Sequence, residues 1–428
     1  MKKNQVIWKI KRAGLLGLVL LLGLGNCFAV AGCKIAGPEE ISEEKEEDSK
    51  PEGSLWDLFL GAGNSEGKTE EETFLKKANN LKSLINMYYW EEAEESDLYE
   101  GMYHGMLESL GDPYSCYYTK EEYAALMEEM EGTYCGIGAL VSQNASTKAI
   151  TIVRPFVDGP AYNAGMLPGD VIVNIDGEDV STWDLELAVK HMKGEQGTKV
   201  EVKVWRASAS DYVEMTITRD LVEVETVTYQ MLEDSIGYIY VMQFDEVTTQ
   251  QFETALNALK SQGMKGLVVD IRDNGGGLLT TVCDMLDLFL EEELIVYTVD
   301  KYDAKEEIFA KEGSIGELPM AILINGFSAS ASEIFSGAMQ DYGLATIVGT
   351  QSFGKGIVQS VIPLNDGSAV KLTVSTYYTP NGRNIHGLGI TPDVEVELEE
   401  ELKKLPVIPL EEDNQLQCAV NEIKKQLQ

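Results

Sequence analysis

Strand-length apolar runs that alternate with helical segments constrain the fold of this chain more than any other feature. The predicted strands of the second half are residues 266–271, 320–324, 346–348 and 370–378. Apolar residues at helical spacing fill three further segments, which are residues 249–262, 279–290 and 331–341. Strands that are apolar on both faces are buried in parallel sheets covered by helices. The sequence therefore predicts an α/β domain with a parallel core.

The first 33 residues have the pattern of an export signal. Basic residues come first, an apolar stretch covers residues 13–24, and small residues lead to Cys33. The segment 30–33 resembles a bacterial lipoprotein cleavage site, which favours lipidation of Cys33. Alternatively, residues 13–32 stay as a membrane anchor, because about 20 residues are just enough to span a bilayer. Either fate predicts an extracytoplasmic bacterial protein that is tethered to the membrane through its N-terminus.

Net charge and cysteine spacing limit the classes of ligand that we expect the chain to bind. Residues 34–72 are acidic and lack an apolar period, so we expect a disordered linker. The chain of 428 residues has a net charge of -37, which argues against a nucleic-acid partner because phosphates would be repelled. The cysteines after the leader are too widely spaced for a metal pattern and are interpreted as buried apolar residues: Cys116, Cys135, Cys283 and Cys418. We expect no metal and no cofactor.

Two regions precede the α/β domain. Residues 73–130 carry apolar side chains at steps of three and four, which predicts helices over 74–88, 98–110 and 121–131. Residues 131–218 change to strand-like alternation with two glycine-rich turns. This second region resembles a PDZ domain, and Gly136, Ile137, Gly138 and Ala139 match the loop that binds a peptide carboxylate in that family. An alternative is that these glycines only permit a tight bend.

Ser330 and Lys355 are the candidate catalytic pair, although each has a structural alternative. Ser330 and Glu333 have the spacing of a capping box at the start of the predicted helix. The same position exposes a serine hydroxyl beside backbone N–H groups that can bind an oxyanion. Lys355 lies in a glycine loop that almost matches a phosphate-binding loop, but Gly356 stands where Mg²⁺ binding needs Ser or Thr. A lysine base must be neutral near pH 7, which burial achieves.

Three motifs together resemble the carboxy-terminal processing peptidases, also called tail-specific proteases. They are residues 270–278 with their glycine turn, residues 328–333, and residues 352–359. The resemblance covers residues 74–398 and implies a crotonase-like core after the PDZ domain. It implies Ser330 as nucleophile, Lys355 as general base and Gln359 as the residue that orients the lysine. The resemblance further implies an oxyanion hole from Gly276 and Ala331, and an acid near the site at Asp341.

The predicted organisation is a leader (1–33), a linker (34–72), a helical region (73–130), a PDZ domain (131–218), a peptidase core (219–398) and a C-terminal tail with a helix (399–428). The family resemblance also implies substrates with free C-termini and pairing into a homodimer, for which residues 414–427 are one candidate helix. His386 is favoured as a rim residue over a catalytic one, and Lys193 as a solvated surface lysine over a gating residue. A catalytically silent PDZ scaffold and a nucleotide-binding protein are the alternative functions.

Overall fold

A computed structural model of the chain describes residues 69–311, 318–405 and 407–428. The predicted leader, Cys33 and nearly all of the linker lie outside the described residues. Described residues up to Thr119 belong to one compact unit and those from Lys120 onward to another.

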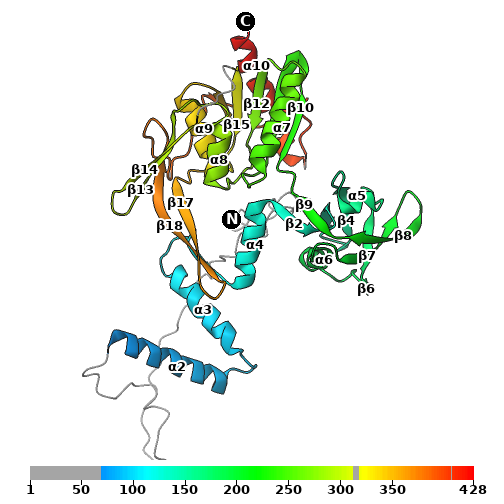
Figure 1. Cartoon of the computed structure of the whole chain (residues 1–428), viewed down its shortest axis with the longest axis vertical. Helices are drawn as coiled ribbons and strands as arrows, with labels where there is room; N and C mark the ends of the chain where they lie inside the picture. The colour runs from blue at the N-terminus through cyan, green and yellow to red at the C-terminus, as the bar shows by residue number, and fades with distance from the viewer. Residues whose placement is uncertain (1–68, 312–317, 406) are drawn as a thin grey trace, which may run out of the picture. The chain divides into compact units, whose positions relative to one another are not determined.

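The first unit consists of two helices and a short strand, which are α2 (Glu70–Tyr88), α3 (Glu95–Glu108) and β1 (Cys116–Tyr118) (Figure 1). Thr69 caps α2, because its hydroxyl accepts from the Glu72 amide while the Glu72 carboxylate accepts from the Thr69 amide. The helix thus begins just inside the predicted linker. Neither α2 nor α3 has a buried residue. Their apolar stripes are therefore left exposed.

The PDZ domain follows helix α4 (Lys120–Glu131) in the second unit. Its main sheet has the order β3-β4-β5-β7-β8, with β6 paired to β5. These strands are β3 (Ala139–Gln143), β4 (Ile150–Pro155), β5 (Val171–Ile175), β6 (Glu178–Asp179), β7 (Lys199–Arg206) and β8 (Asp211–Thr218). The helices are α5 (Pro160–Asn163) and α6 (Leu185–Met192), and β2 (Thr133–Gly136) pairs with β9 (Asp220–Glu223). The predicted PDZ domain is confirmed.

The α/β domain is built on a sheet of the order β10-β11-β12-β15-β16-β19. The strands are β10 (Val227–Met231), β11 (Ile236–Val241), β12 (Gly266–Asp270), β15 (Met320–Ile324), β16 (Thr346–Gly349) and β19 (Val394–Glu395). All pairings after the antiparallel β10–β11 pair are parallel. The predicted parallel core is therefore confirmed.

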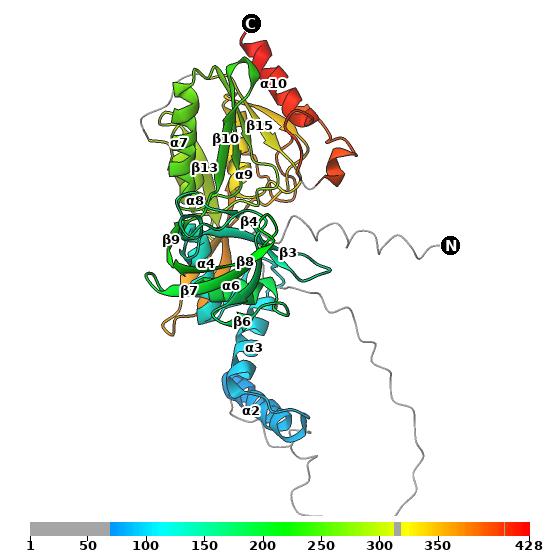
Figure 2. The same ribbon diagram turned by 90° about the vertical axis from the view of Figure 1, so that its right-hand side faces the viewer.

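Helices cover both faces of this sheet. On one face lie α7 (Thr248–Ser261), α8 (Leu279–Leu286) and α9 (Ala331–Asp341), and on the other lies α10 (Asn414–Gln426) (Figures 1 and 2). Alternate residues of β12 divide between the two faces. Leu267 and Val269 pack in the cluster that contains α7, α8 and α9, whereas Val268 packs with Leu416 and Ile423 of α10. This division explains why the residues that point to either face of β12 are apolar.

A second, antiparallel sheet was largely missed by the sequence analysis. It joins β14 (Lys305–Phe309), β13 (Leu294–Asp300), β18 (Ala369–Tyr378) and β17 (Ile357–Pro363). Only β18 was predicted. Helix α8 is also shorter than the predicted segment 279–290. Within the described parts of the chain, no helix combines the length and apolarity needed to cross a membrane.

Candidate active site

Ser330 occupies the N-terminus of α9 in a strained conformation. Its φ is 56° and its ψ is -114°, whereas an ordinary N-cap residue is extended. Its carbonyl accepts from the amides of Glu333 at 2.8 Å and Ile334 at 3.0 Å, which starts the helix. A non-glycine residue at positive φ costs free energy and persists where its surroundings enforce it. Ser330 therefore departs from the ordinary N-cap geometry of the structural alternative.

The Glu333 carboxylate ties the Ser330 segment to the Lys355 loop. Its Oε2 accepts from the amide of Ser330 at 2.9 Å and from the amide of Lys355 at 2.8 Å. Its Oε1 accepts from the hydroxyl of Ser352 at 2.5 Å and from the amide of Gly354 at 2.7 Å. The side chain is fully buried, so these four donors replace its hydration.

Tyr377 of β18 makes a second bridge between the same two residues. Its hydroxyl donates toward the carbonyl of Lys355 at 2.6 Å and toward the carbonyl of Ser330 at 3.1 Å. Burial, and then the nearby Glu333 charge, raise the pKa of Tyr377, so the phenol stays protonated and able to donate. Ser330 and Lys355 are thus held together by one buried carboxylate and one buried hydroxyl.

The glycine loop around Lys355 binds an internal carboxylate. The amides of Gly354 and Lys355, which a phosphate-binding loop would turn toward a nucleotide, donate to Glu333. The interpretation of residues 349–356 as a failed phosphate loop therefore has a structural reason. Lys355 itself is half-buried, which places its side chain between solvent and the interior.

The glycine turn after β12 packs closely against Ser330. A Cβ on Gly276 would lie 2.8 Å from Ser330 Cβ and 3.1 Å from the Ala331 nitrogen, so only glycine fits. The Gly276 amide donates to Asn274 Oδ1 at 2.9 Å. Ala331 is in the first turn of α9, where helix geometry leaves amides without an intrahelical acceptor. The assignment of Gly276 and Ala331 as oxyanion donors remains a prediction.

Three other predicted residues have distinct positions. Gln359 donates to Thr373 Oγ1 at 3.5 Å. Asp341 lies at the opposite end of α9 from Ser330, where it pairs with Arg383 and accepts from the Asn381 amide at 2.8 Å. An 11-residue helix is about 16 Å long, so Asp341 is far from Ser330. His386 is exposed, and its assignment as a rim residue stays a prediction.

A cavity of about 1500 Å³ lies beside Ser330 and Lys355. Ser330, Ala331, Gly276, Lys355 and Gln359 all line it, whereas Asp341 does not. Apolar side chains such as Met242, Phe244, Leu279 and Ile334 add to its wall. A cavity with apolar walls and a few convergent polar groups is the usual form of a substrate site.

Two acidic residues that interact electrostatically, the buried Asp245 and the half-buried Glu129, line this cavity. Burial, followed by the charge of Glu129, raises the pKa of Asp245 to about 7. Burial likewise raises the pKa of Glu129, which belongs to α4. The same segment touches the glycine turn, because the Phe244 amide donates to the Gly276 carbonyl at 3.0 Å. Sequence reasoning missed this pair, since two acids 116 positions apart carry no local signal.

The predicted carboxylate-binding loop of the PDZ domain lies between β2 and β3. Gly136 ends β2, Gly138 has a φ of 71°, and Ala139 begins β3. Lys193, at the end of α6, pairs with Glu128 of α4 and lies over the Tyr134 ring at 4.9 Å. It is therefore not the freely solvated lysine favoured by the sequence analysis.

In the described part of the chain, no group of three or more His, Cys, Asp or Glu residues is arranged to hold a metal ion.

Comparisons with known proteins agree with this architecture. The family model of peptidase family S41 matches residues 235–396, a PDZ domain model matches 152–206, and the N-terminal domain of the activating protease CtpB matches 22–122. A carboxy-terminal-processing protease of Bartonella bacilliformis is 37% identical over 350 residues, which cover 79% of each chain. The carboxy-terminal processing protease CtpA of Bacillus subtilis is 34% identical over 347 residues, 81% of this chain and 73% of that protein.

Among solved structures, one from Bacteroides fragilis assigned to the S41 proteases aligns with a TM-score of 0.50, over 81% of this chain and 97% of that chain. Its identity of 14% makes this a likeness of fold alone. The α/β core, the PDZ domain and the family match together define a serine peptidase of the S41 class. The chain belongs to the family of carboxy-terminal processing proteases.

Proposed function

We propose that the protein is an exported, membrane-tethered serine endopeptidase that cleaves protein substrates near their C-termini, with a Ser330–Lys355 dyad. One observation carries the dyad: Glu333 and Tyr377 each bind the backbone of both residues beside one cavity. Two independent bridges to the same pair are difficult to explain by helix capping alone, because a cap needs neither Lys355 nor Tyr377.

The proposed reaction is acyl transfer. Neutral Lys355 takes the proton from the Ser330 hydroxyl, whose oxygen attacks the scissile carbonyl. The amides of Ala331 and Gly276 stabilise the oxyanion, and each donor is worth about 3 kcal/mol in comparable sites. Lys355 then protonates the leaving amine, and water releases the acyl group. Gln359, on the cavity wall, orients the lysine.

The PDZ domain would select the substrate. A peptide C-terminus adds as a strand beside β3, and its carboxylate binds amides of the loop from Gly136 to Ala139. The exposed apolar faces of α2 and α3 support a homodimer contact. The membrane tether, through Cys33 or an N-terminal anchor, rests on the leader sequence.

A second candidate is a catalytically silent PDZ scaffold that binds C-terminal peptides. This candidate is favoured by the hydrogen bond from the Gly276 amide to Asn274 Oδ1, because an amide that already donates to a side chain does not point at a substrate oxyanion. Activity in this structure would require the Gly276 amide to exchange Asn274 for the substrate oxyanion.

Cleavage and binding of one peptide separate the two candidates. The chain is incubated with a peptide that has a free apolar C-terminus, with Ser330→Ala and Lys355→Ala as variants. The dyad predicts cleavage by the natural chain, no cleavage by either variant, and peptide binding by all three. Binding without cleavage by the natural chain would favour the scaffold, and full cleavage by a variant would exclude the dyad.

A further inference from the structure

The C-terminal helix α10 is joined to the loop that carries Gly276. We propose that Asp413, the N-cap residue of α10, and Gln415 in its first turn are positioning residues for the active site, acting through Arg272. The inference rests on the proposed function, because it assigns these residues to the same reaction. Both lie beyond residue 396, where the match to the peptidase family model ends.

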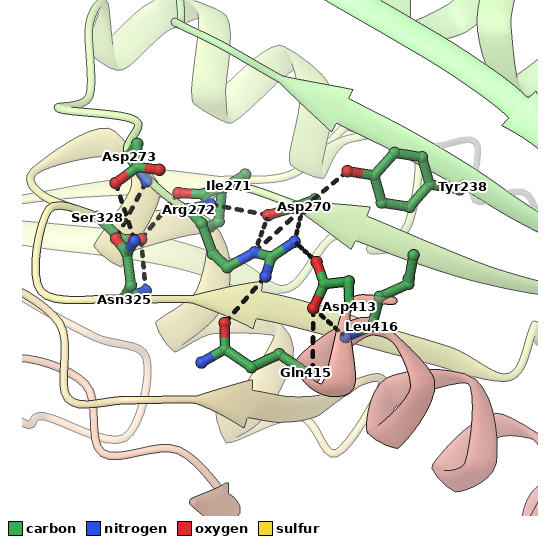
Figure 3. Close-up of polar contacts among 10 residues, drawn as sticks. All are labelled: Tyr238, Asp270, Ile271, Arg272, Asp273, Asn325, Ser328, Asp413, Gln415 and Leu416. Atoms are coloured by element: carbon green, nitrogen blue, oxygen red, sulfur yellow. Dashed lines mark hydrogen bonds and ion pairs between the residues drawn. The ribbon is translucent and has the colours of Figure 1, made fainter. Parts of the chain in front are cut away.

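Arg272 is held from two sides (Figure 3). On its own loop, Asp270 accepts from its Nε at 2.9 Å and from its Nη2 at 2.5 Å. From α10, Asp413 accepts from Nη2 at 2.7 Å and Gln415 accepts from Nη1 at 2.9 Å. All three guanidinium nitrogens therefore have acceptors, and the planar group has one orientation.

Asp413 adds a second negative charge to the neutral pair of Asp270 and Arg272. Arg272, Asp270 and Asp413 are all buried, so two carboxylates face one guanidinium. The surplus negative charge of Asp413 lies at the N-terminus of α10, where the amides of Gln415 and Leu416 each donate to its Oδ1 at 3.0 Å. Tyr238 donates to Asp270 at 2.8 Å on the other side. The helix dipole thus stabilises the carboxylate that fixes Arg272.

Residues 271–274, on both sides of Arg272, form hydrogen bonds with the residues on both sides of Ser330. Ser328 donates to the Ile271 carbonyl at 2.8 Å, and Asn325 exchanges two bonds with Asp273 (Figure 3). The Asn274 carbonyl then accepts from the Ala329 amide at 3.1 Å and from the Ser332 hydroxyl at 2.9 Å. A shift of Arg272 therefore reaches Gly276 and Ser330 through a continuous backbone with few degrees of freedom.

Asp413→Asn tests this role in the full chain. The amide still caps α10 but no longer puts a charge on Arg272. We expect kcat on a C-terminal peptide to fall about tenfold to a hundredfold, with KM unchanged, because small displacements of reacting groups cost that much. We also expect faster amide hydrogen exchange over residues 271–276. In the double variant Asp413→Asn/Gln415→Glu, a carboxylate returns to Arg272 from position 415, and most of the kcat should return.

Lys424→Ala is the matched control. It removes another ion pair of α10, with Asp234 at 2.6 Å, that does not touch the loop. We expect natural kcat and natural exchange over residues 271–276. If Asp413→Asn does not fold, Gln415→Met probes the same guanidinium with the charge of Asp413 retained.

The outcomes separate the inference from the proposed function. Natural kcat and natural exchange in the Asp413→Asn variant would overturn the positioning role, as would an equal fall of kcat in the Lys424→Ala control. Faster exchange of residues 271–276 in a chain that never cleaves peptide would support the positioning contact and refute the peptidase activity.

Discussion

Removal of the Tyr377 hydroxyl isolates the bridge between Ser330 and Lys355. The Tyr377→Phe variant keeps the ring, which is 1% exposed, and deletes only the donor. The Ser330 carbonyl keeps two amide donors from α9. The Lys355 carbonyl loses its 2.6 Å bond to a buried hydroxyl, so the change falls mainly on the lysine.

The expected losses of stability and of kcat follow from the one hydrogen bond that the Tyr377→Phe variant lacks. Leaving a buried carbonyl without its donor costs about 1–3 kcal/mol of unfolding free energy. Freeing the Lys355 backbone by a fraction of an ångström lowers kcat by roughly tenfold to a hundredfold, which is about 1.4 to 2.7 kcal/mol of the barrier. KM should stay unchanged, because Tyr377 does not reach the predicted peptide-binding loop of the PDZ domain.

Peptide cleavage kinetics and denaturant unfolding measure the two effects. The control is Tyr342→Phe, which removes a hydroxyl that donates to the Leu294 carbonyl at 2.8 Å, away from the site. It should lose stability to a similar or smaller extent and keep its kcat. A Tyr377→Phe variant with kcat within twofold of the natural chain would refute the bridge.

Three further predictions concern other parts of the structure. Ser330→Gly should be more stable than Ser330→Ala by about 1 kcal/mol in denaturant unfolding, because glycine relieves the strain at φ 56°; equal stability would argue against strain. Asp245→Asn should gain stability over the natural chain as the pH rises from about 4 to about 7. In that window the native Asp245, whose pKa is raised to about 7, holds a proton that the unfolded chain releases, at up to about 1.4 kcal/mol per pH unit. Unfolding curves at pH 5 and 8 check this, and a pH-independent difference would contradict it. Gly138→Ala should weaken binding of a C-terminal peptide about tenfold by fluorescence anisotropy, since its Cβ would meet Pro160 at 3.2 Å at a φ of 71°; unchanged affinity would exclude the loop.

The order of elements in the core was predictable because strands that are buried on both faces consist almost entirely of apolar residues. Strands β12 and β15 are apolar at nearly every position, since helices cover both faces of the sheet. Helix α9 was predicted with its observed bounds because small and apolar residues follow a capping pattern at Ser330. Strand β14 was missed because Lys305, Glu306 and Glu307 hide its apolar pattern. Strands β13 and β17 carried signals that the sequence analysis overlooked, because residues 294–299 are mostly apolar and Asp366-Gly367 marks the turn between β17 and β18.

The candidate site was predictable only where local motifs exist. Ser330 and Lys355 stood out through their glycine and serine neighbours, and the structure brings their backbones together. Glu333 was recognised as a cap but not as the acceptor for the lysine loop, because that role depends on a contact 22 positions away. The pairing of Asp413 with Arg272 was not predictable, because the two residues are 141 positions apart. In the sequence, an acid before a C-terminal helix indicates only an ordinary N-cap. Such pairings are set by the tertiary fold.

The central claim is that Ser330 is a nucleophile activated by Lys355. The most direct measurement is labelling of the full chain with a fluorophosphonate, followed by mass-spectrometric mapping of the modified residue. We predict one adduct, on Ser330, that is absent in the Lys355→Ala variant even though this variant remains folded. An adduct on another serine, or undiminished labelling of Ser330 without Lys355, would contradict the account.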